Sequence, residues 1–406
     1  MQSKFIRLGY KKFAADYLFT GKEMHYNGEV LITDEQGIVK EIVAKENAGD
    51  DVYFVNGIIC PGFINCHCHL ELSHLKGAID THTGLVSFIL AILKLRHSSE
   101  TEMIAAMLAA QEAMINSGIV AVGDISNNAM SLPTKLKSKL YYHNFIEVSG
   151  FSPAIAQQRF DVAKDVYHQF IEHYPNQTSI VPHAPYSVSE QLFKLIDNFG
   201  HSAISSIHNQ EAFDENEFFL KGVGQFTHLY QQLGVDTQPF FKPTNKNSLH
   251  SIAGFIQTPK KILFVHNTFT SSLDIDYLNA THPNQEKIFC LCINANLYIE
   301  NKLPPINLLM DNHCTLVLGT DSLASNEQLS IVAEMQTISQ HFPLIPTATL
   351  LQWATANGAK ALGIQDRFGS FEKGMQPGII NINHLSADGT ITKTSHSTVL
   401  MGGSTW

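Results

Sequence analysis

The sequence contains, at residues 61–73, the stretch Pro61-Gly62-Phe63-Ile64-Asn65-Cys66-His67-Cys68-His69-Leu70-Glu71-Leu72-Ser73. An apolar run over residues 55–64 leads into it, which is typical of a buried strand. Because side chains alternate between the two faces of a strand, the two histidines share one face and the two cysteines share the other. Neutral imidazole nitrogens bind metal ions well, so this pair predicts a metal site.

Two other interpretations of this stretch stay open at this point. In the first, both histidines simply alternate in a core strand, because a single His-x-His pattern often matches by chance. In the second, residues 66–69 supply four ligands to one closed site, although strand alternation places the cysteines on the opposite face. The rest of the chain has to decide between these interpretations.

The composition is that of a globular protein with room for more than one domain. The chain has 406 residues, of which 44% are hydrophobic and 16% charged, enough for one barrel-sized domain and a smaller one. A formal net charge of −10 argues against a nucleic-acid partner, because contacts to phosphates require clustered Lys and Arg. We therefore expect a small-molecule substrate.

The sequence also predicts where the protein resides. Residues 1–20 contain no continuous apolar segment after their basic residues, so no signal peptide is expected. The longest apolar stretch, residues 84–95, is too short to span a bilayer. The six cysteines lack the spacing of a disulfide framework, and we interpret them as reduced thiols. These features predict a cytoplasmic protein with no membrane partner.

The two ends of the chain share one pattern. Residues 1–58 contain short predicted strands at 17–19, 29–32 and 38–43, with a hairpin turn at residues 34–37. From residue 374 onward the chain returns to short strands, at 378–382 and 397–401. We predict that residues 1–58 and 369–406 build one small β-sandwich domain, into which residues 59–368 are inserted.

The inserted part, residues 59–368, alternates between short apolar strands and helical segments. The predicted helices include Glu100–Asn116, Ile155–His173, Ser189–Asn198 and Asn216–Leu233. The predicted strands are Ile64–His69, Ile119–Ile125, Leu140–Val148, Ser179–His183, Ala203–His208, Lys261–His266, Ile288–Ile293 and Thr315–Thr320. Eight strands separated by helical crossovers predict an α/β fold of the TIM-like (β/α)8 barrel type.

Polar residues mark the carboxyl ends of five of these predicted strands. The ends carry His67 and His69, His183, His208, His266 and Asp321, and Glu211 follows shortly after the fifth strand. Each residue has an ordinary alternative, since a histidine there can be a hydrogen-bonded core residue and Asp321 can cap the next helix. Because the catalytic groups of such barrels lie at the carboxyl ends of strands, the whole set predicts an active site.

These residue types suit metal-assisted hydrolysis. Three histidines and one aspartate can hold a divalent ion and leave room for water, and the ion lowers the pKa of that water toward ~7. Asp321 would ligate the ion and accept the proton of the water, while His266 polarises the same water. Glu211 would transfer a proton to a ring nitrogen or to a leaving amine. We therefore predict Glu211, His266 and Asp321 as catalytic residues.

The motifs around these residues resemble those of the amidohydrolase superfamily. The matching segments are Pro61–His69, His183–Ser187, His208–Glu211, Val265-His266, Leu318–Asn326, Thr355–Gly363 and Gly369–Gly374. They occur in the same order over most of the chain. They are most similar to the chlorohydrolase and deaminase branch, which includes S-adenosylhomocysteine, guanine and aminofutalosine deaminases.

This resemblance implies a metallo-dependent hydrolase barrel with a mononuclear site and one divalent ion per subunit, Zn²⁺ or Fe²⁺. The implied ligands are His67, His69, His208 and Asp321. Glu211 and His266 would handle protons, and His183 would contact the substrate ring. His183 stands where dinuclear members place a carbamylated lysine, which favours deamination over two-metal hydrolysis of ring amides. The branch also implies a homodimer.

Further residues are implied as substrate contacts. Residues 69–77 are similar to a stretch of aminofutalosine deaminases in which Glu71 would help to bind the substrate, and the alternative is an exposed or salt-bridged carboxylate. Phe88 would cover the face of a purine, or else pack in the core as part of an amphipathic helix. The implied set of substrate contacts is His183, Glu71, Phe88, Asn296 and Ser325.

One position departs from the pattern of the branch. Asn294 stands where the branch has the arginine of a Cys-Pro-Arg-Ser-Asn motif. If that arginine contacts an anionic or polar part of the family substrate, the substrate of this protein differs there. Arg96 and Arg159 are candidate partners for a carboxylate, although the usual place of an arginine is the solvated surface.

We expect a metal-dependent deaminase that attacks an aminated purine-type ring and releases ammonia, with aminofutalosine, on the route to menaquinone, as the preferred substrate. One alternative is deamination of another purine or a pterin, such as S-adenosylhomocysteine, methylthioadenosine, adenosine or guanine. A second is hydrolytic dechlorination. A non-catalytic barrel scaffold would be indicated by loss of a ligand, of Glu211 or of His266, and all of these residues are present.

Overall fold

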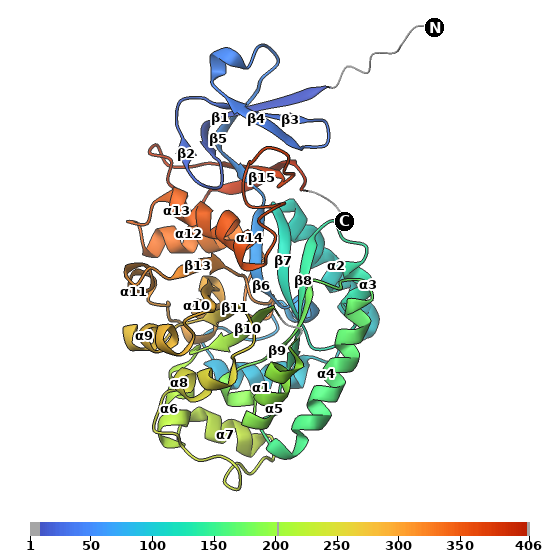
Figure 1. Ribbon diagram of the computed structural model, residues 1–406, viewed down its shortest axis with the longest axis vertical. Helices are drawn as coiled ribbons and strands as arrows, with labels where there is room; N and C mark the ends of the chain where they lie inside the picture. The colour runs from blue at the N-terminus through green and yellow to red at the C-terminus, as the bar shows by residue number, and fades with distance from the viewer. Residues whose placement is uncertain (1–8, 201–202, 404–406) are drawn as a thin grey trace.

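The computed structural model describes residues 9–200 and 203–403. A small sheet lies at one end of the molecule, and a larger body of strands and helices lies below it (Figure 1). The strand β5 (Tyr53–Pro61) of the small sheet leads through Gly62 into β6 (Phe63–Cys68) of the larger body. Gly62 suits this junction because a Cβ atom there would lie 2.3 Å from Cγ1 of Val120. The strand β5 therefore runs past residue 58, where the sequence placed the limit between the domains.

The small domain is built from both ends of the chain, as predicted. Its other strands are β1 (Tyr10–Phe19), β2 (Met24–His25), β3 (Val30–Asp34), β4 (Val39–Val43), β14 (Ile379–Asn383) and β15 (His396–Met401). The strand β14 pairs antiparallel with β5, which joins the C-terminal segment to the N-terminal one. All seven strands belong to one sheet, ordered β15-β14-β5-β1-β3-β4 with β2 beside β1, rather than to the two separate sheets of a sandwich.

The larger body contains all eight predicted barrel strands. After β6 these are β7 (Ile119–Ser126), β8 (Tyr141–Val148), β9 (Thr178–Pro182), β10 (Ile204–Asn209), β11 (Lys261–His266), β12 (Glu286–Leu291) and β13 (Thr315–Leu318). They form two parallel four-stranded sheets, β6-β7-β8-β9 and β10-β11-β12-β13. The sheets meet where the His208 N–H donates to the His183 carbonyl, and where Cys68 and Asp321 form a parallel bridge. Both junctions lie at the carboxyl ends of the strands.

Helices alternate with these strands. They are α1 (Leu85–Leu95), α2 (Glu100–Asn116), α3 (Leu132–Lys135), α4 (Ala156–Ile171), α5 (Glu190–Phe199), α6 (Phe213–Lys221), α7 (Gln225–Gln232), α8 (Ser248–Ile252), α9 (Ser272–Thr281), α10 (Ile293–Glu300), α11 (Ile306–Asp311), α12 (Ile331–His341), α13 (Thr347–Gln352) and α14 (Gly358–Ala361). The single helix predicted at 216–233 is wrong. Gly222 and Gly224 have φ values of +69° and +96°, which end α6 and start α7 separately because a helix needs negative φ.

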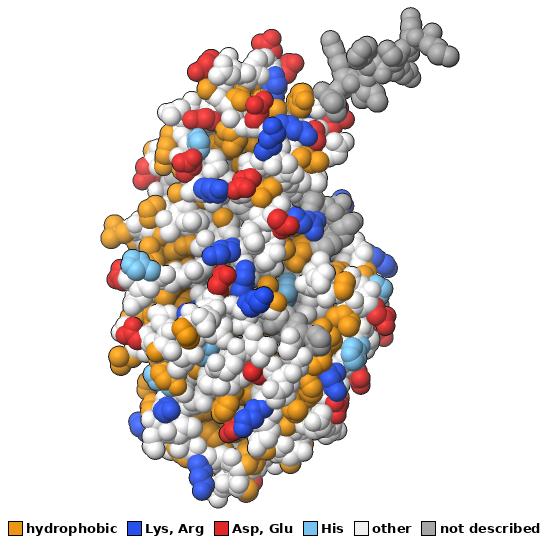
Figure 2. Space-filling view, viewed as in Figure 1, with side chains coloured by type: hydrophobic (Ala, Val, Ile, Leu, Met, Phe, Trp, Pro, Cys, Tyr) orange, Lys and Arg blue, Asp and Glu red, His pale blue; other side chains and the backbone are white. Residues whose placement is uncertain are grey.

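The core of the barrel is apolar up to the ends of its strands. Ile64, Val265 and Val317 pack inside it together with Cys66 and Cys290. All six cysteines are free, and five of them are buried. None of the helices in the described ranges is both long and apolar enough to cross a membrane. Figure 2 shows acidic and basic side chains interspersed over one face of the molecule.

Candidate metal and active site

Four predicted ligands converge at the carboxyl ends of the barrel strands. His67 and His69 come from β6, His208 from β10, and Asp321 follows β13; their ligand atoms all lie within 4.8 Å of one another. The Nε2 atom of His69 lies 3.2 Å from that of His67 and 3.3 Å from that of His208. Tetrahedral ligands held at about 2.0–2.1 Å from an ion lie about 3.4 Å apart. The spacing of these atoms therefore fits one divalent ion.

The loop after β13 is tied to β6, which explains why Asp321 reaches the histidines. The His67 carbonyl oxygen accepts the N–H groups of Thr320 and Asp321, at 3.0 and 3.1 Å. The side chain of Asn65 donates to the Thr320 hydroxyl and accepts the Thr320 N–H. The Asp321 Oδ1 atom then lies 3.7 Å from His67 Nε2 and 3.5 Å from His69 Nε2. Residues 255 positions apart in the chain thus form one side of the site.

The electrostatics of the four groups suit a cation. Burial lowers the pKa of His67, His69 and His208, that of His69 to about 4, so all three imidazoles are neutral near pH 7. Burial alone would raise the pKa of Asp321, but its contacts with His67, His69 and His266 hold that pKa well below its usual range. Three neutral nitrogens and one carboxylate are a donor set for Zn²⁺ or Fe²⁺.

The backbone fixes which nitrogen of His208 faces the ligand cluster. Its Nδ1 atom lies 2.8 Å from the carbonyl oxygen of His183. Because a carbonyl oxygen only accepts, Nδ1 carries the proton and Nε2 presents a lone pair to the other ligands. The His183 ring lies beside His208, with centroids 4.8 Å apart, and its own Nδ1 is 2.6 Å from the Ser187 hydroxyl. Burial lowers the pKa of His183 to about 3, so its ring is neutral as well.

Glu211 and His266 form a second pair beside the ligand cluster. The Oε1 atom of Glu211 lies 3.6 Å from Nε2 of His266. The other ring nitrogen of His266 lies 2.8 Å from Oδ1 of Asn296, whose amide group donates to the Thr268 hydroxyl. An amide oxygen only accepts, so His266 carries its proton on Nδ1 and turns the lone pair of Nε2 toward Glu211.

Glu211 is a buried acid, and no Lys or Arg in residues 9–200 and 203–403 forms an ion pair with it. Burial raises its pKa well above the usual range, and the charges of Asp321, Glu215 and Glu300 raise it further. Burial lowers the pKa of His266, although Asp321 opposes the shift. A protonated carboxyl group beside a neutral imidazole can donate a proton to a substrate and take one back.

Glu71 is buried and hydrogen-bonded, so neither the exposed nor the salt-bridged alternative describes it. Its carboxyl accepts the backbone N–H of Asn127 at 3.1 Å and the amide group of Asn127 at 2.9 Å. The same amide donates to Glu147 at 3.3 Å, and Oε2 of Glu147 lies 3.5 Å from Nδ1 of His208. Burial raises the pKa of Glu71 to about 7 and that of Glu147 to about 8. The sequence did not indicate Asn127 and Glu147, which lie at the carboxyl ends of β7 and β8.

The remaining predicted residues divide between the site and its surroundings. The hydroxyl of Ser325 donates to Oδ2 of Asp321, which places Ser325 directly behind a predicted ligand. Phe88 is buried in α1 as part of the main hydrophobic core. Arg96 and Arg159 are both exposed. Asn294, at the start of α10, donates its backbone N–H and its amide to Glu334.

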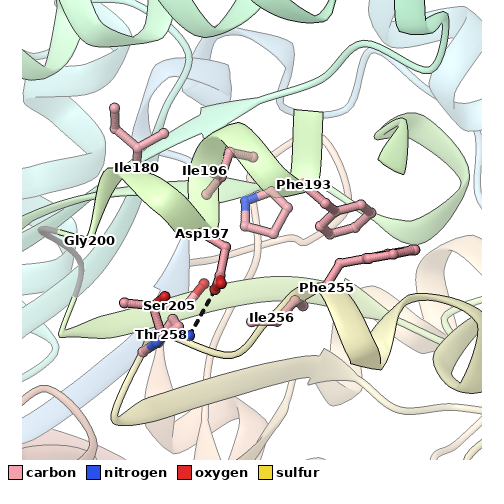
Figure 3. Close-up of a pocket in the computed structure, with 11 residues that line it drawn as sticks. Ile180, Phe193, Ile196, Asp197, Gly200, Ser205, Phe255, Ile256 and Thr258 are labelled. Carbon is pink, nitrogen blue, oxygen red and sulfur yellow. Dashed lines mark hydrogen bonds between the residues drawn. The ribbon is translucent and has the colours of Figure 1, made fainter. Parts of the chain in front are cut away.

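A separate hollow lies away from these residues, between α5 and the chain before β11 (Figure 3). Phe193, Ile196 and Phe255 give it an apolar wall. Asp197 accepts the backbone N–H groups of Gln257 and Thr258, both at 2.8 Å, which ties the two sides together. The hollow contains none of the predicted site residues, so we assign it to the packing of α5.

The chain belongs to the amidohydrolase family, whose sequence pattern matches residues 58–399. The resemblance seen in the motifs is thus confirmed. An adenosine deaminase of Helicobacter pylori is 26% identical over 320 residues, which cover 77% of this chain and 76% of that protein. An aminodeoxyfutalosine deaminase of Nitratiruptor sp. is 24% identical over 323 residues, covering 76% of this chain and 75% of that protein.

Solved structures have the same fold. Aminofutalosine deaminase of Helicobacter pylori, in complex with methylthio-coformycin, superposes with a TM-score of 0.76 at 20% identity, covering 92% of this chain and 93% of that one. Atrazine chlorohydrolase of Arthrobacter aurescens, complexed with zinc, superposes with a TM-score of 0.72 at 13% identity, covering 97% of this chain and 95% of that one. These similarities confirm the predicted barrel fold.

Proposed function

We propose that this protein is a metal-dependent deaminase that hydrolyses the exocyclic amine of a purine-type ring and releases ammonia. The observation that carries the proposal is the buried Glu211 carboxyl group 3.6 Å from His266 Nε2, beside a cluster of three histidines and one aspartate. A structural metal site, in which protein ligands fill every position, does not require a proton-transferring pair such as Glu211 and His266. The curated relatives named above are deaminases, which supports the same reaction.

Each group in the site has a separate task in this reaction. A divalent ion, when bound, supplies a Lewis acid and lowers the pKa of water. His67, His69 and His208 hold the ion through neutral nitrogens, and Asp321 completes the set and accepts a proton from the attacking water. His266 orients that water through the lone pair on Nε2. These assignments follow from the protonation states that burial and hydrogen bonding impose.

Glu211 handles the proton on the side of the substrate. Burial raises the pKa of its carboxyl group, which favours the protonated form, and this form can donate to a ring nitrogen while water adds to the neighbouring carbon. Asp321 can then pass the proton that it took from the water to the amino group, which leaves as ammonia, and the proton of the added hydroxyl group returns to Glu211. His183, with a neutral ring next to His208, contacts the heterocycle. Glu71, Asn296 and Ser325 complete the proposed surroundings of the substrate, whereas Phe88 packs in the hydrophobic core.

The substrate that we propose is aminofutalosine, in a route to menaquinone. The stretch at residues 69–77 and the aminodeoxyfutalosine deaminase relative support this choice. We further propose one Zn²⁺ or Fe²⁺ ion per subunit, and a homodimeric protein that acts in the cytoplasm on small molecules, without a nucleic-acid or membrane partner. Metal analysis and sedimentation of the purified protein test the ion and the oligomeric state.

A second candidate is a deaminase of another purine nucleoside. The 5-methylthioadenosine/S-adenosylhomocysteine deaminase of Teredinibacter turnerae is 25% identical over 348 residues, which cover 82% of this chain and 73% of that protein. Asn294 is uncharged and bonded to Glu334, so this position does not offer a substrate carboxylate the positive charge of the arginine found there in the branch. This difference favours a substrate without a carboxylate, such as methylthioadenosine, over one that carries an amino-acid group, such as S-adenosylhomocysteine.

The test is ammonia release from metal-loaded protein with aminofutalosine, methylthioadenosine, S-adenosylhomocysteine, adenosine, guanine and a pterin. Turnover of aminofutalosine alone would support both the reaction and the substrate. Preference for another member of the panel would keep the reaction and replace the substrate. Chloride release from a chlorinated triazine, without ammonia release from any amine, would overturn the proposal in favour of a chlorohydrolase.

A further inference from the structure

A buried acidic side chain outside the ligand cluster joins the start of α10 to the loop that carries Asp321. Glu334 lies in α12 and is fully buried. It accepts the backbone N–H of Asn294 at 3.0 Å, the Asn294 amide at 2.9 Å and the Asn326 amide at 2.9 Å. None of the ion pairs among the described residues includes Glu334. Its hydrogen-bond partners are neutral N–H donors, and they belong to two segments, the start of α10 and the loop after β13.

The first connection runs from Glu334 to His266. Asn294 is the second residue of α10, whose first backbone N–H groups have no partner within the helix. Glu334 takes up one of them and so fixes the start of this helix. Two residues later, Asn296 accepts from Nδ1 of His266 at 2.8 Å and sets its tautomer. A shift of the helix start would move Asn296 and turn the His266 ring.

The second connection runs from Glu334 to Asp321. The Asn326 amide group that donates to Glu334 also donates to the carbonyl oxygen of Thr320, at 2.9 Å. That carbonyl belongs to the peptide bond preceding Asp321. Asp321 has a φ value of +56°, which an L-residue adopts only when its surroundings enforce it. The link through Asn326 is one of the contacts that hold this conformation.

We infer that Glu334 is a positioning residue, which sets the Asp321 carboxylate and the His266 ring relative to each other; this inference rests on the proposed function. Burial raises the pKa of Glu334 to about 8, whereas the N–H groups of Asn294 and Asn326 that point at both of its oxygens favour the ionised form. A glutamine would turn an NH₂ group toward one of these donors and lose that bond. An alanine would leave all three donors buried without a partner.

The test compares Glu334→Gln and Glu334→Ala with Ser339→Ala, all loaded with metal. Ser339 lies on the same helix and donates to the carbonyl of Ile391 at 2.8 Å, so its replacement loosens α12 without touching either loop. We expect kcat to fall by about 10-fold for Glu334→Gln and about 100-fold for Glu334→Ala, with KM within about 3-fold, because misplaced catalytic groups cost rate rather than binding. The pH dependence of kcat should move in both Glu334 variants and stay in place in Ser339→Ala.

A second readout does not depend on activity. Replacement of the ion by Co²⁺ makes the visible spectrum report the ligand geometry, and the spectrum should change in both Glu334 variants but not in Ser339→Ala. Glu334 variants that lose thermal stability while keeping the wild-type kcat, pH profile and Co²⁺ spectrum would overturn the inference. A wild-type protein that deaminates nothing, with a Co²⁺ spectrum that still responds to Glu334, would overturn the proposed function and leave the link to Asp321 standing.

Discussion

The lone pair on Nε2 of His266 faces Oε1 of Glu211 across 3.6 Å. His266 is the last residue of β11 and Glu211 follows β10, and neither is among the four metal-ligand candidates. Burial favours the neutral form of each group, so it raises the pKa of Glu211 and lowers the pKa of His266. The site thus contains a proton donor and a proton acceptor side by side.

The first prediction concerns Glu211. Glu211→Gln keeps the size and the neutral charge of the side chain but cannot donate and recover a proton. We expect it to bind one metal ion per subunit and to lose turnover by at least about 10³-fold. Metal analysis together with ammonia release checks both parts. Glu217→Gln, in α6, is the matched control and should behave as wild type; a Glu211→Gln enzyme with near-normal turnover would exclude the proton-transfer role.

The second prediction concerns the ligand set. His67→Ala removes a neutral nitrogen from a site where four ligand atoms lie within 4.8 Å of one another, so metal and activity should be lost together. Removal of the metal from the wild type by a chelator should lower its melting temperature. An ion at a free concentration of 1,000 times its Kd stabilises the folded protein by about 4 kcal/mol. Calorimetry of both proteins with and without added Zn²⁺ tests this. His74→Ala, outside the cluster, should retain the response to Zn²⁺.

The third prediction concerns stability and pH. Burial raises the pKa of Glu215 from 4.5 to about 7. Between these values the unfolded chain has released the proton while the folded protein keeps it, so the contribution of Glu215 to stability is present below about pH 4.5 and is lost as the pH rises toward 7. The expected loss is about 1–3 kcal/mol. Urea unfolding at pH 5, 6, 7 and 8 should show that the free energy of unfolding declines less with pH for Glu215→Gln than for wild type. A constant difference in stability between the two proteins does not affect this comparison.

Glu217→Gln serves as the control for that measurement, because Glu217 is on the same helix and forms an exposed pair with Lys221 at 2.8 Å. Its stability should follow the wild-type dependence on pH. An identical decline in the Glu215→Gln and wild-type proteins would show that Glu215 does not carry this proton.

The fourth prediction concerns a buried ion pair. Nζ of Lys135 lies 2.6 Å from Oδ2 of Asp124, and both side chains are fully buried. The other carboxylate oxygen of Asp124 accepts the N–H of Leu70, directly after a metal-ligand candidate. Lys135→Met leaves an uncompensated charge in the core, which should cost about 3–5 kcal/mol in the free energy of unfolding.

Chemical denaturation measures that cost. The exposed Lys137→Met, two residues away, should change stability by less than about 0.5 kcal/mol. The double variant Lys135→Met, Asp124→Asn should recover part of the loss, because it removes the unpaired charge and keeps an acceptor for Leu70. Equal stability of Lys135→Met and wild type would show that the pair contributes no net energy.

The sequence by itself was enough for the architecture and for the chemical character of the site. Apolar runs of strand length, separated by helical segments, predicted eight strands, and the structure contains all eight. Local alternation placed His67 and His69 on one face, and their Nε2 atoms do meet, at 3.2 Å. Both results depend on periodicity between near neighbours, which the order of residues encodes directly. The roles of these residues in metal binding and catalysis stay predictions until the variants are measured.

Only the tertiary structure decided how the site is held together. Asn294 and Glu334 are 40 positions apart, and Asn65 and Thr320 are 255 apart; no periodicity relates such pairs, because folding alone brings them together. The same is true of Asn127, which joins Glu71 to Glu147 across two strand ends. The break between α6 and α7 also depended on backbone conformation, as Gly222 and Gly224 take φ values that a helix excludes. Protonation is decided at this level too, since burial and the neighbouring charges set the pKa of Glu211.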